Sequence, residues 1–140
     1  MREILFRGKY SKKSPDWIEG SFHRDEDTNI CEIAYRYYKK EGETKAGIWV
    51  YGVVDPETVG QYTGLKDKNG KKIFEGDIVK IPLYEGCQEK AIAVVAWDIL
   101  CAVFYLHGKR VNTDFYHYFG NDCEVIGNIH DNKLEDFENG

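Results

Sequence analysis

The stretch that decides the fold is residues 61–79, which read QYTGLKDKNGKKIFEGDIV. At its centre, Asn69 and Gly70 separate two short runs that contain β-branched and aromatic residues. Asn-Gly is the dipeptide best able to place both central residues of a type I′ turn at positive φ, so we predict a tight turn of that type. A short strand is expected next at 77–82, with Pro82 at its end, where the missing N–H costs little.

Period-2 alternation predicts further short strands on both sides of this stretch. They are 3–10 and 17–22, forming a hairpin, then 45–54, then 90–97 and 100–105, forming a hairpin that turns near Asp98, and a closing strand at 122–129. Residues 108–120 read as a loop and 132–137 as one helical turn. Residues 29–40 fit either a helix capped by Thr28 or a strand, and their β-branched and aromatic content favours the strand.

Short strands closed by turn signals at this spacing predict a mainly β protein of short antiparallel strands, in a small barrel or sandwich. We expect an N-terminal β-rich lobe at 1–60, packed on a C-terminal lobe at 61–140 that ends in an acidic tail. No flexible linker long enough to make the lobes independent separates them.

The length of 140 residues suits one domain or two small modules, and the 42% hydrophobic content suits a folded chain. The net charge is −5, and residues 121–140 alone hold six acidic residues against one basic residue, Lys133. The rest of the chain is therefore neutral. This balance excludes a strongly basic nucleic-acid groove but allows a weak local basic patch.

No apolar run is long enough for a membrane-spanning helix, and charges interrupt what would be the core of a signal peptide at residues 1–8. We therefore expect a soluble, cytoplasmic protein without a membrane partner. The four cysteines stand singly, which favours free thiols, usually buried, over disulfides. They are Cys31, Cys87, Cys101 and Cys123.

The sequence contains no clear catalytic or metal-binding constellation, so we expect neither enzymatic activity nor a cofactor or metal. The nearest grouping of metal-ligand types is too widely spaced: His107, His117, Cys123 and His130. No nucleophile elbow surrounds a serine, and no phosphate-binding loop is present. Asp67, Glu75 and Asp77 could meet around the turn, but turn hydrogen bonds explain Asp67 better than acid–base chemistry does.

The first functional hypothesis is a non-enzymatic module that binds another protein. Its candidate interaction surface consists of the polar residues in and beside the 61–79 stretch, which we expect to be exposed. They are Gln61, Tyr62, Thr63, Asp67, Asn69, Glu75 and Asp77.

The second hypothesis is a weak nucleic-acid-binding module. It uses the region 35–40, where aromatic and basic residues are interleaved, and the lysines of the region 66–72. Its candidate residues are Arg36, Tyr37, Tyr38, Lys39, Lys71 and Lys72. The same residues would also fit a solvated edge strand protected by charge. Such an edge at 29–40 could instead pair with a second copy of the chain to form a homo-oligomer.

Three blocks, 1–8, 57–79 and 124–130, together resemble the YopX family of phage and prophage proteins. The resemblance implies a small β-rich protein encoded by a bacteriophage or prophage and acting in the cytoplasm of the bacterial host. The partner of the first hypothesis would then be an unidentified host or phage protein. The resemblance also implies an SH3-like barrel in the C-terminal half. It supplies no biochemical activity, and a fold of this kind hosts many functions.

Overall fold

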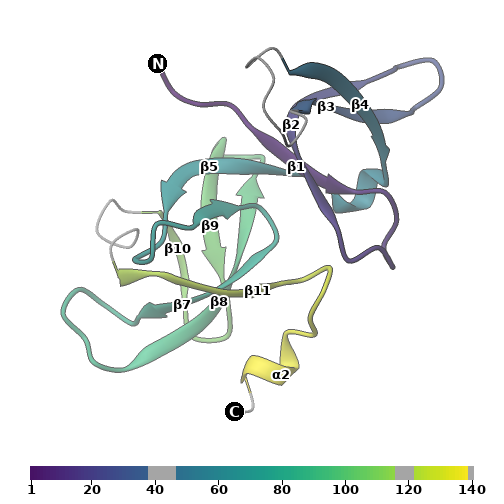
Figure 1. The fold of residues 1–140 in the computed structure, drawn as a ribbon. Coiled ribbons are helices and arrows are strands. Elements are labelled where there is room, and N and C mark those ends of the chain that lie inside the picture. The colour runs from purple at the N-terminus through teal and green to yellow at the C-terminus, as the bar shows by residue number, and fades with distance from the viewer. Residues whose placement is uncertain (38–46, 116–121, 139–140) are drawn as a thin grey trace, which may run out of the picture. The chain divides into compact units, whose positions relative to one another are not determined.

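A computed structural model describes residues 1–37, 47–115 and 122–138, and the chain folds into two compact units, Glu3–Gln61 and Tyr62–Gly140. Both units are built from short antiparallel strands (Figure 1). The prediction of a mainly β, antiparallel fold is therefore confirmed. No helix within these described ranges is long and apolar enough to cross a bilayer.

In the first unit the strands follow the order β4-β3-β2-β1, and the first two residues of β5 pair with β1. Their bounds are β1 Phe6–Lys9, β2 Trp17–Arg24, β3 Cys31–Tyr37, β4 Ile48–Val54 and β5 Gly60–Lys66, with a 3₁₀ turn, η1, at Pro56–Thr58. The β1–β2 hairpin is as predicted. Residues 31–37 form a strand, as their β-branched and aromatic content predicted, while positions 38–40 of that stretch lie outside the described residues.

The core of the first unit lies on one face of this sheet. Ile18, Cys31, Ile33 and Val54 are buried there, and Phe22, Tyr35 and Val59 pack against them. Except for Val59, which follows η1, these side chains come from alternating positions of β2 and β3 and from the end of β4, because successive residues of a strand point to opposite faces.

The second unit contains a five-stranded antiparallel sheet in the order β10-β9-β8-β7-β11. Its elements are β6 Lys72–Phe74, which pairs with the end of β5, then β7 Asp77–Pro82, β8 Lys90–Asp98, β9 Val103–His107, β10 Asn112–Asp114, β11 Glu124–Asn128 and the helical turn α2 Glu135–Glu138. Within the described residues the outer strands β10 and β11 do not pair with each other, so strand pairing does not close this sheet.

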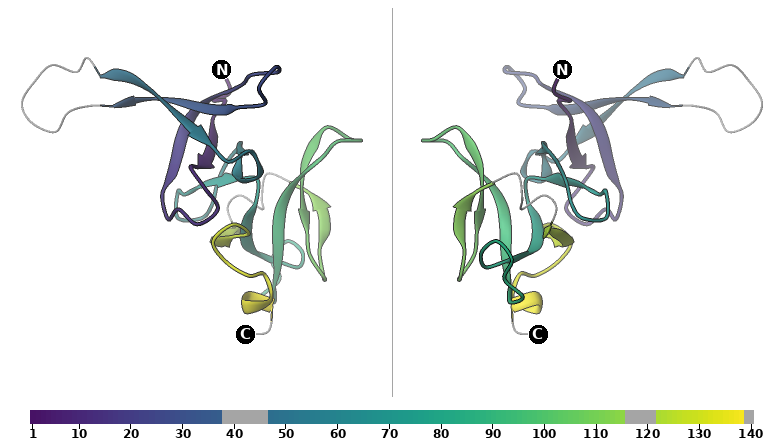
Figure 2. Two further views of the ribbon diagram at one scale, coloured as in Figure 1. Left: turned by 90° about the vertical axis from the view of Figure 1, so that its right-hand side faces the viewer. Right: turned by 90° about the vertical axis from the view of Figure 1, so that its left-hand side faces the viewer.

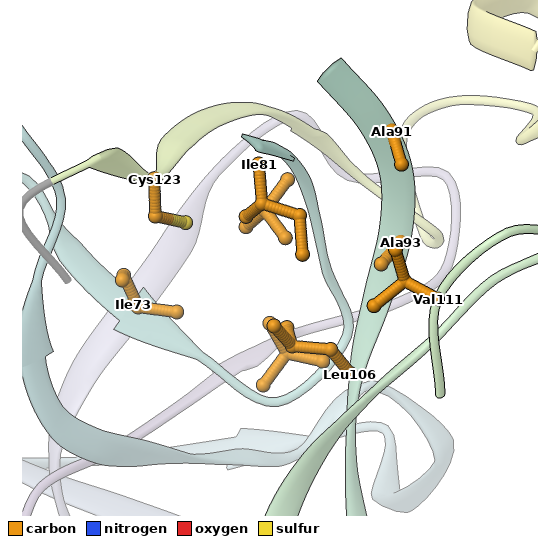
Figure 3. Close-up of a cluster of buried hydrophobic side chains, with 9 residues drawn as sticks. Ile73, Ile81, Ala91, Ala93, Leu106, Val111 and Cys123 are labelled. Carbon is orange, nitrogen blue, oxygen red and sulfur yellow. The ribbon is translucent and has the colours of Figure 1, made fainter. Parts of the chain in front are cut away.

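The core of the second unit collects side chains from most of its strands (Figure 3). Ile73 of β6, Ile81 of β7, Ala93 of β8 and Leu106 of β9 are fully buried, together with Cys123 just before β11. The 61–79 stretch therefore contributes buried residues to β6 and β7, and β7 pairs with β11 near the C-terminal end of the chain.

Two local predictions need correction. The chain turns tightly at Asn69-Gly70, but Gly70 alone has positive φ (+80°), whereas the predicted type I′ turn requires positive φ at Asn69 as well. The segment expected to be a loop at 108–120 contains the short strand β10, because a Val111 carbonyl accepts from Gly108 N at 2.7 Å and folds the chain back along β9.

The cysteines differ sharply in their surroundings. All four are free; Cys31 and Cys123 are buried, Cys87 is partly buried and Cys101 is exposed. Burial, followed by the nearby Asp67 carboxylate, raises the pKa of Cys123 to about 12. The Asp98 carboxylate, beside Cys101, raises the pKa of that thiol as well.

We expect neutral iodoacetamide at pH 8 to alkylate Cys101 of the folded protein first and Cys123 only after unfolding, because the thiolate is the nucleophile and a buried thiol is also inaccessible. Asp98→Asn removes the charge that raises the pKa of Cys101, so alkylation of Cys101 should become a few-fold faster. Peptide mapping by mass spectrometry at successive times measures both effects. Alkylation of Cys123 at the rate of Cys101 in the folded protein would contradict the burial described here.

Candidate functional site

The most exposed apolar row within a strand lies on β4. Trp49, Tyr51 and Val53 occupy alternate positions and keep 55%, 67% and 55% of their surface exposed. Alternate residues share one face of a strand, so the three side chains form a continuous row. Isolated exposed apolar residues are ordinary, but a contiguous row of this size is typical of an interaction site.

The neighbouring strand contributes few charges to this face. Across β3 and β4, Arg36 lies opposite Trp49, Ala34 opposite Tyr51 and Glu32 opposite Val53. The Arg36 guanidinium carbon lies 5.2 Å from the centroid of the Trp49 ring. The face is therefore apolar in the middle and carries one charge of each sign, so its net charge is zero. We call Trp49, Tyr51 and Val53, with these β3 neighbours, the β4 face.

The opposite side of β4 fixes the strand to the core. Val54 is buried in the first unit. At Gly52 there is no space for a side chain, because a Cβ would lie only 2.7 Å from Ile18 Cδ1 and 3.3 Å from Tyr10 Cε1. A side chain at residue 52 would therefore push β4 away from the core. Figure 2 shows β3 and β4 lying side by side.

Strand β4 is the last strand in the order of its sheet. Its sequence, IWVYGVV, contains no Lys, Pro or acidic residue. These are the residues with which proteins usually protect an edge strand from pairing with another chain. The edge predicted at 29–40 is wrong for its described strand, Cys31–Tyr37, because β3 pairs with β2 on one side and β4 on the other.

The predicted exposure of the candidate interaction surface is also wrong at three positions. Tyr62, Asp67 and Asp77 keep only 5%, 6% and 1% of their surface exposed. Tyr62 packs against the Phe74 ring, with centroids 5.6 Å apart. Of the other four residues, Gln61, Thr63 and Glu75 are half-buried and only Asn69 is exposed.

Asp67 is an internal hydrogen-bond acceptor. Its Oδ1 accepts from the backbone N–H groups of Asn69 and Lys71, both at 2.9 Å, and its Oδ2 accepts from Val125 N at 3.0 Å. The turn bond predicted for this residue is therefore present, and the bond to Val125 reaches a residue 58 positions away. Burial by itself would raise the pKa of Asp67, but the three N–H donors outweigh it and hold that pKa below its ordinary value.

Asp77 has a similar role at the next turn. Its Oδ2 accepts from the buried Phe74 N at 2.8 Å. Gly76 between them has φ of +85°, donates its N–H to Val95 O at 2.8 Å and accepts from Ile129 N at 2.9 Å. Its backbone thus joins the turn to β8 and to the residue after β11, and the positive φ explains why glycine stands there.

The nucleic-acid candidates fall into two places. In the first unit Arg36 contacts Trp49, Tyr37 is exposed, and Tyr38 and Lys39 lie outside the described residues. In the second unit Lys71 is exposed, and the Lys72 amine lies 5.7 Å from the Tyr62 ring. Because Tyr62 is buried, its ring offers no free platform on which a base could stack.

Within the described ranges, no group of three or more His, Cys, Asp or Glu side chains could hold a metal ion. Of the widely spaced ligand types, His117 lies outside those ranges, His107 Nδ1 lies 2.7 Å from Asn112 Oδ1, and Cys123 is buried with its thiol protonated at neutral pH. The feature that sequence reasoning missed is the β4 face. Its signal was present, since 48–54 is apolar or aromatic on both faces of the predicted strand.

Replacing Asp67 with Ala should lower the free energy of unfolding by about 2–4 kcal/mol, because three N–H donors lose a charged acceptor. Asp67→Asn retains one acceptor oxygen, so its free energy of unfolding should lie between that of Asp67→Ala and that of the unmodified chain. Since the folded pKa of Asp67 is depressed, its charge stabilises the fold above its unfolded pKa, and that contribution is lost as the pH falls through the folded value.

Urea unfolding at pH 7 and at acid pH measures both effects. The matched control is Asp27→Asn, a change at an exposed aspartate in the β2–β3 turn, which should change the unfolding free energy by no more than about 0.5 kcal/mol. An Asp67→Ala protein as stable as this control would contradict the role of the carboxylate.

Comparison with known proteins agrees with the resemblance found in the sequence. The family model described as YopX protein matches residues 5–135, nearly the whole chain. No curated protein matches it. The matched residues include both the β5–β6 turn and strand β11, which the Asp67 carboxylate joins. On this match the chain belongs to the YopX family.

Proposed function

We propose that the protein is a non-enzymatic interaction module that binds another protein through the β4 face. The observation that carries the proposal is the row of Trp49, Tyr51 and Val53, exposed on the last strand of a sheet. Tyr and Trp are the residues that most often dominate binding energy at interfaces, because each supplies a large contact area at a small cost in side-chain entropy.

The partner that fits this face is an extended segment that adds to the sheet beside β4. Backbone hydrogen bonds along the edge would supply affinity, and apolar side chains at alternate positions would contact the row. Because β4 is uncharged and its face has zero net charge, an uncharged, apolar segment matches it best. A strongly charged segment would lose hydration against the apolar row and meet a like charge at Arg36 or Glu32.

The family suggests the setting of this interaction. We propose that the protein is encoded by a phage or prophage, acts in the cytoplasm of the bacterial host and binds a host or phage protein there. We also propose that the second unit is an SH3-like module. Its five antiparallel strands, with β11 returning beside β7, support that assignment.

The experiment compares partner capture by the unmodified protein and by the double variant Trp49→Ala/Tyr51→Ala. Each protein is immobilised, and lysate from infected bacteria is passed over it. We expect a specific protein to be retained by the unmodified chain and lost from the double variant. Removal of one interface hot spot costs about 2 kcal/mol, roughly thirtyfold in Kd.

The matched control is Tyr84→Ala, an aromatic residue of similar exposure (65%) in the second unit, which should leave capture unchanged. Circular dichroism verifies that each variant is folded. Equal capture by the double variant would refute the β4 face as the site. Self-association measured by sedimentation, or binding of a labelled single strand lost in the double variant, would replace this proposal with a homo-oligomer or with nucleic-acid binding.

A further inference from the structure

A second surface feature lies in the second unit, independent of the β4 face. A groove of about 630 Å³ lies between the outer face of strands β7 and β8 and the segment that follows β11. This volume is within the range of about 300–1,000 Å³ that binding pockets occupy. Its apolar lining includes Ile92, Ile126 and Phe137, and its charged lining is mainly basic.

The segment after β11 is held at both ends. At its start, Asn128 N donates to Asn132 Oδ1 at 3.2 Å. The Phe137 ring lies over the backbone of β11, so that a Cβ at Gly127 would be 3.1 Å from it. At its far end Glu138 forms an ion pair with Lys109 at 2.8 Å. The acidic tail found in the sequence thus forms one wall of the groove (α2 in Figure 1).

Most of the charges around the groove already have partners. Lys109 is paired with Glu138, and Arg110 with Glu89 at 2.8 Å. Glu124, opposite Lys80 in the β7–β11 register, is paired with Lys68 at 3.2 Å. Among the described residues, nothing forms a hydrogen bond or ion pair with the side-chain amine of Lys80 or of Lys90.

The spacing of Lys80 and Lys90 indicates how far apart the negative charges of a ligand should be. Lys80 pairs with Ile92 and Pro82 with Lys90, so Lys80 and Lys90 are diagonal neighbours on one face of the β7–β8 ladder. Such neighbours are about 7–8 Å apart. In an extended peptide, side chains at alternate positions are about 6.6–6.8 Å apart and point the same way. Two carboxylates at alternate positions therefore match the two amines.

We propose that this groove binds an extended acidic segment of another protein, in which acidic residues alternate with aromatic or other apolar residues. The acidic side chains contact Lys80 and Lys90, and the apolar side chains between them point toward the wall that Phe137 forms. The groove itself already pairs a lysine with a carboxylate, at Lys109 and Glu138. Nucleic acid fits less well, because its closely spaced phosphates would face Asp136 with only two lysines available.

The test uses the full chain and a labelled peptide of alternating Glu and Phe, with fluorescence anisotropy at low and high salt. A peptide of alternating Gln and Phe has the same shape without charge and should bind at least about tenfold more weakly. Affinity for the acidic peptide should fall as salt rises.

Variants locate the binding. The double variant Lys80→Glu/Lys90→Glu reverses the two charges. It should bind the acidic peptide at least about tenfold more weakly, because like charges then face each other. Lys80→Gln/Lys90→Gln should also weaken it and serves if the first variant does not fold. Phe137→Ala should weaken both peptides, since it removes an apolar wall. Lys13→Glu, an exposed lysine of the first unit, is the matched control and should bind as the unmodified chain does.

Equal binding of the two peptides, or unchanged binding by both lysine variants, would overturn the proposal. So would binding of a labelled oligothymidylate in preference to the acidic peptide. Capture through the β4 face should be unchanged in the lysine variants. Failure of the groove proposal therefore leaves the β4 face proposal intact, and failure of the β4 face proposal leaves the groove proposal intact.

Discussion

The fold of the second unit depends on one carboxylate. Asp67 closes the β5–β6 turn through two backbone N–H groups and, with its other oxygen, accepts from Val125 of β11. The adjacent Lys68 N donates to Cys123 O at 2.9 Å. A short-range turn is thus joined to the far end of the chain, where β11 completes the five-stranded sheet. A neutral side chain could accept fewer of these bonds, and weaker ones.

This constraint explains why two polar residues of the 61–79 stretch, Asp67 and Asp77, are buried rather than exposed. Asp67 and Asp77 are conspicuous in the sequence because they are charged, yet both are buried and accept from backbone N–H groups. The Phe74 N–H that donates to Asp77 is itself buried, and buried backbone donors are almost always paired. Tyr62 is aromatic because it packs on Phe74. A polar side chain beside a turn can accept from the local backbone or face a partner in solvent, and the sequence alone does not separate the two.

The surfaces that do suit binding have different chemistry in the two units. In the first unit the β4 face is apolar in the middle with zero net charge, and the strand β4 itself contains no charged residue. In the second unit the groove is basic, and the acidic C-terminal segment forms its wall. The net charge of −5 does not reveal this basic groove. Part of the acidic tail lies against it, where Glu138 forms an ion pair with Lys109 of the β9–β10 turn.

The sequence by itself determined the local structure. Alternation located most strands, β-branched and aromatic content decided residues 31–37, and Asn69-Gly70 placed the turn, because strand period and turn chemistry are properties of neighbouring residues. Tertiary structure decided what depends on distant residues: the type of that turn, strand β10, the burial of Asp67 and which strand stands last in the sheet. Strand β4 stands last in the sheet because β3 pairs with β2 on one side and with β4 on the other. Trp49 and Tyr51 are exposed because they lie on the face of β4 opposite the core that contains Val54.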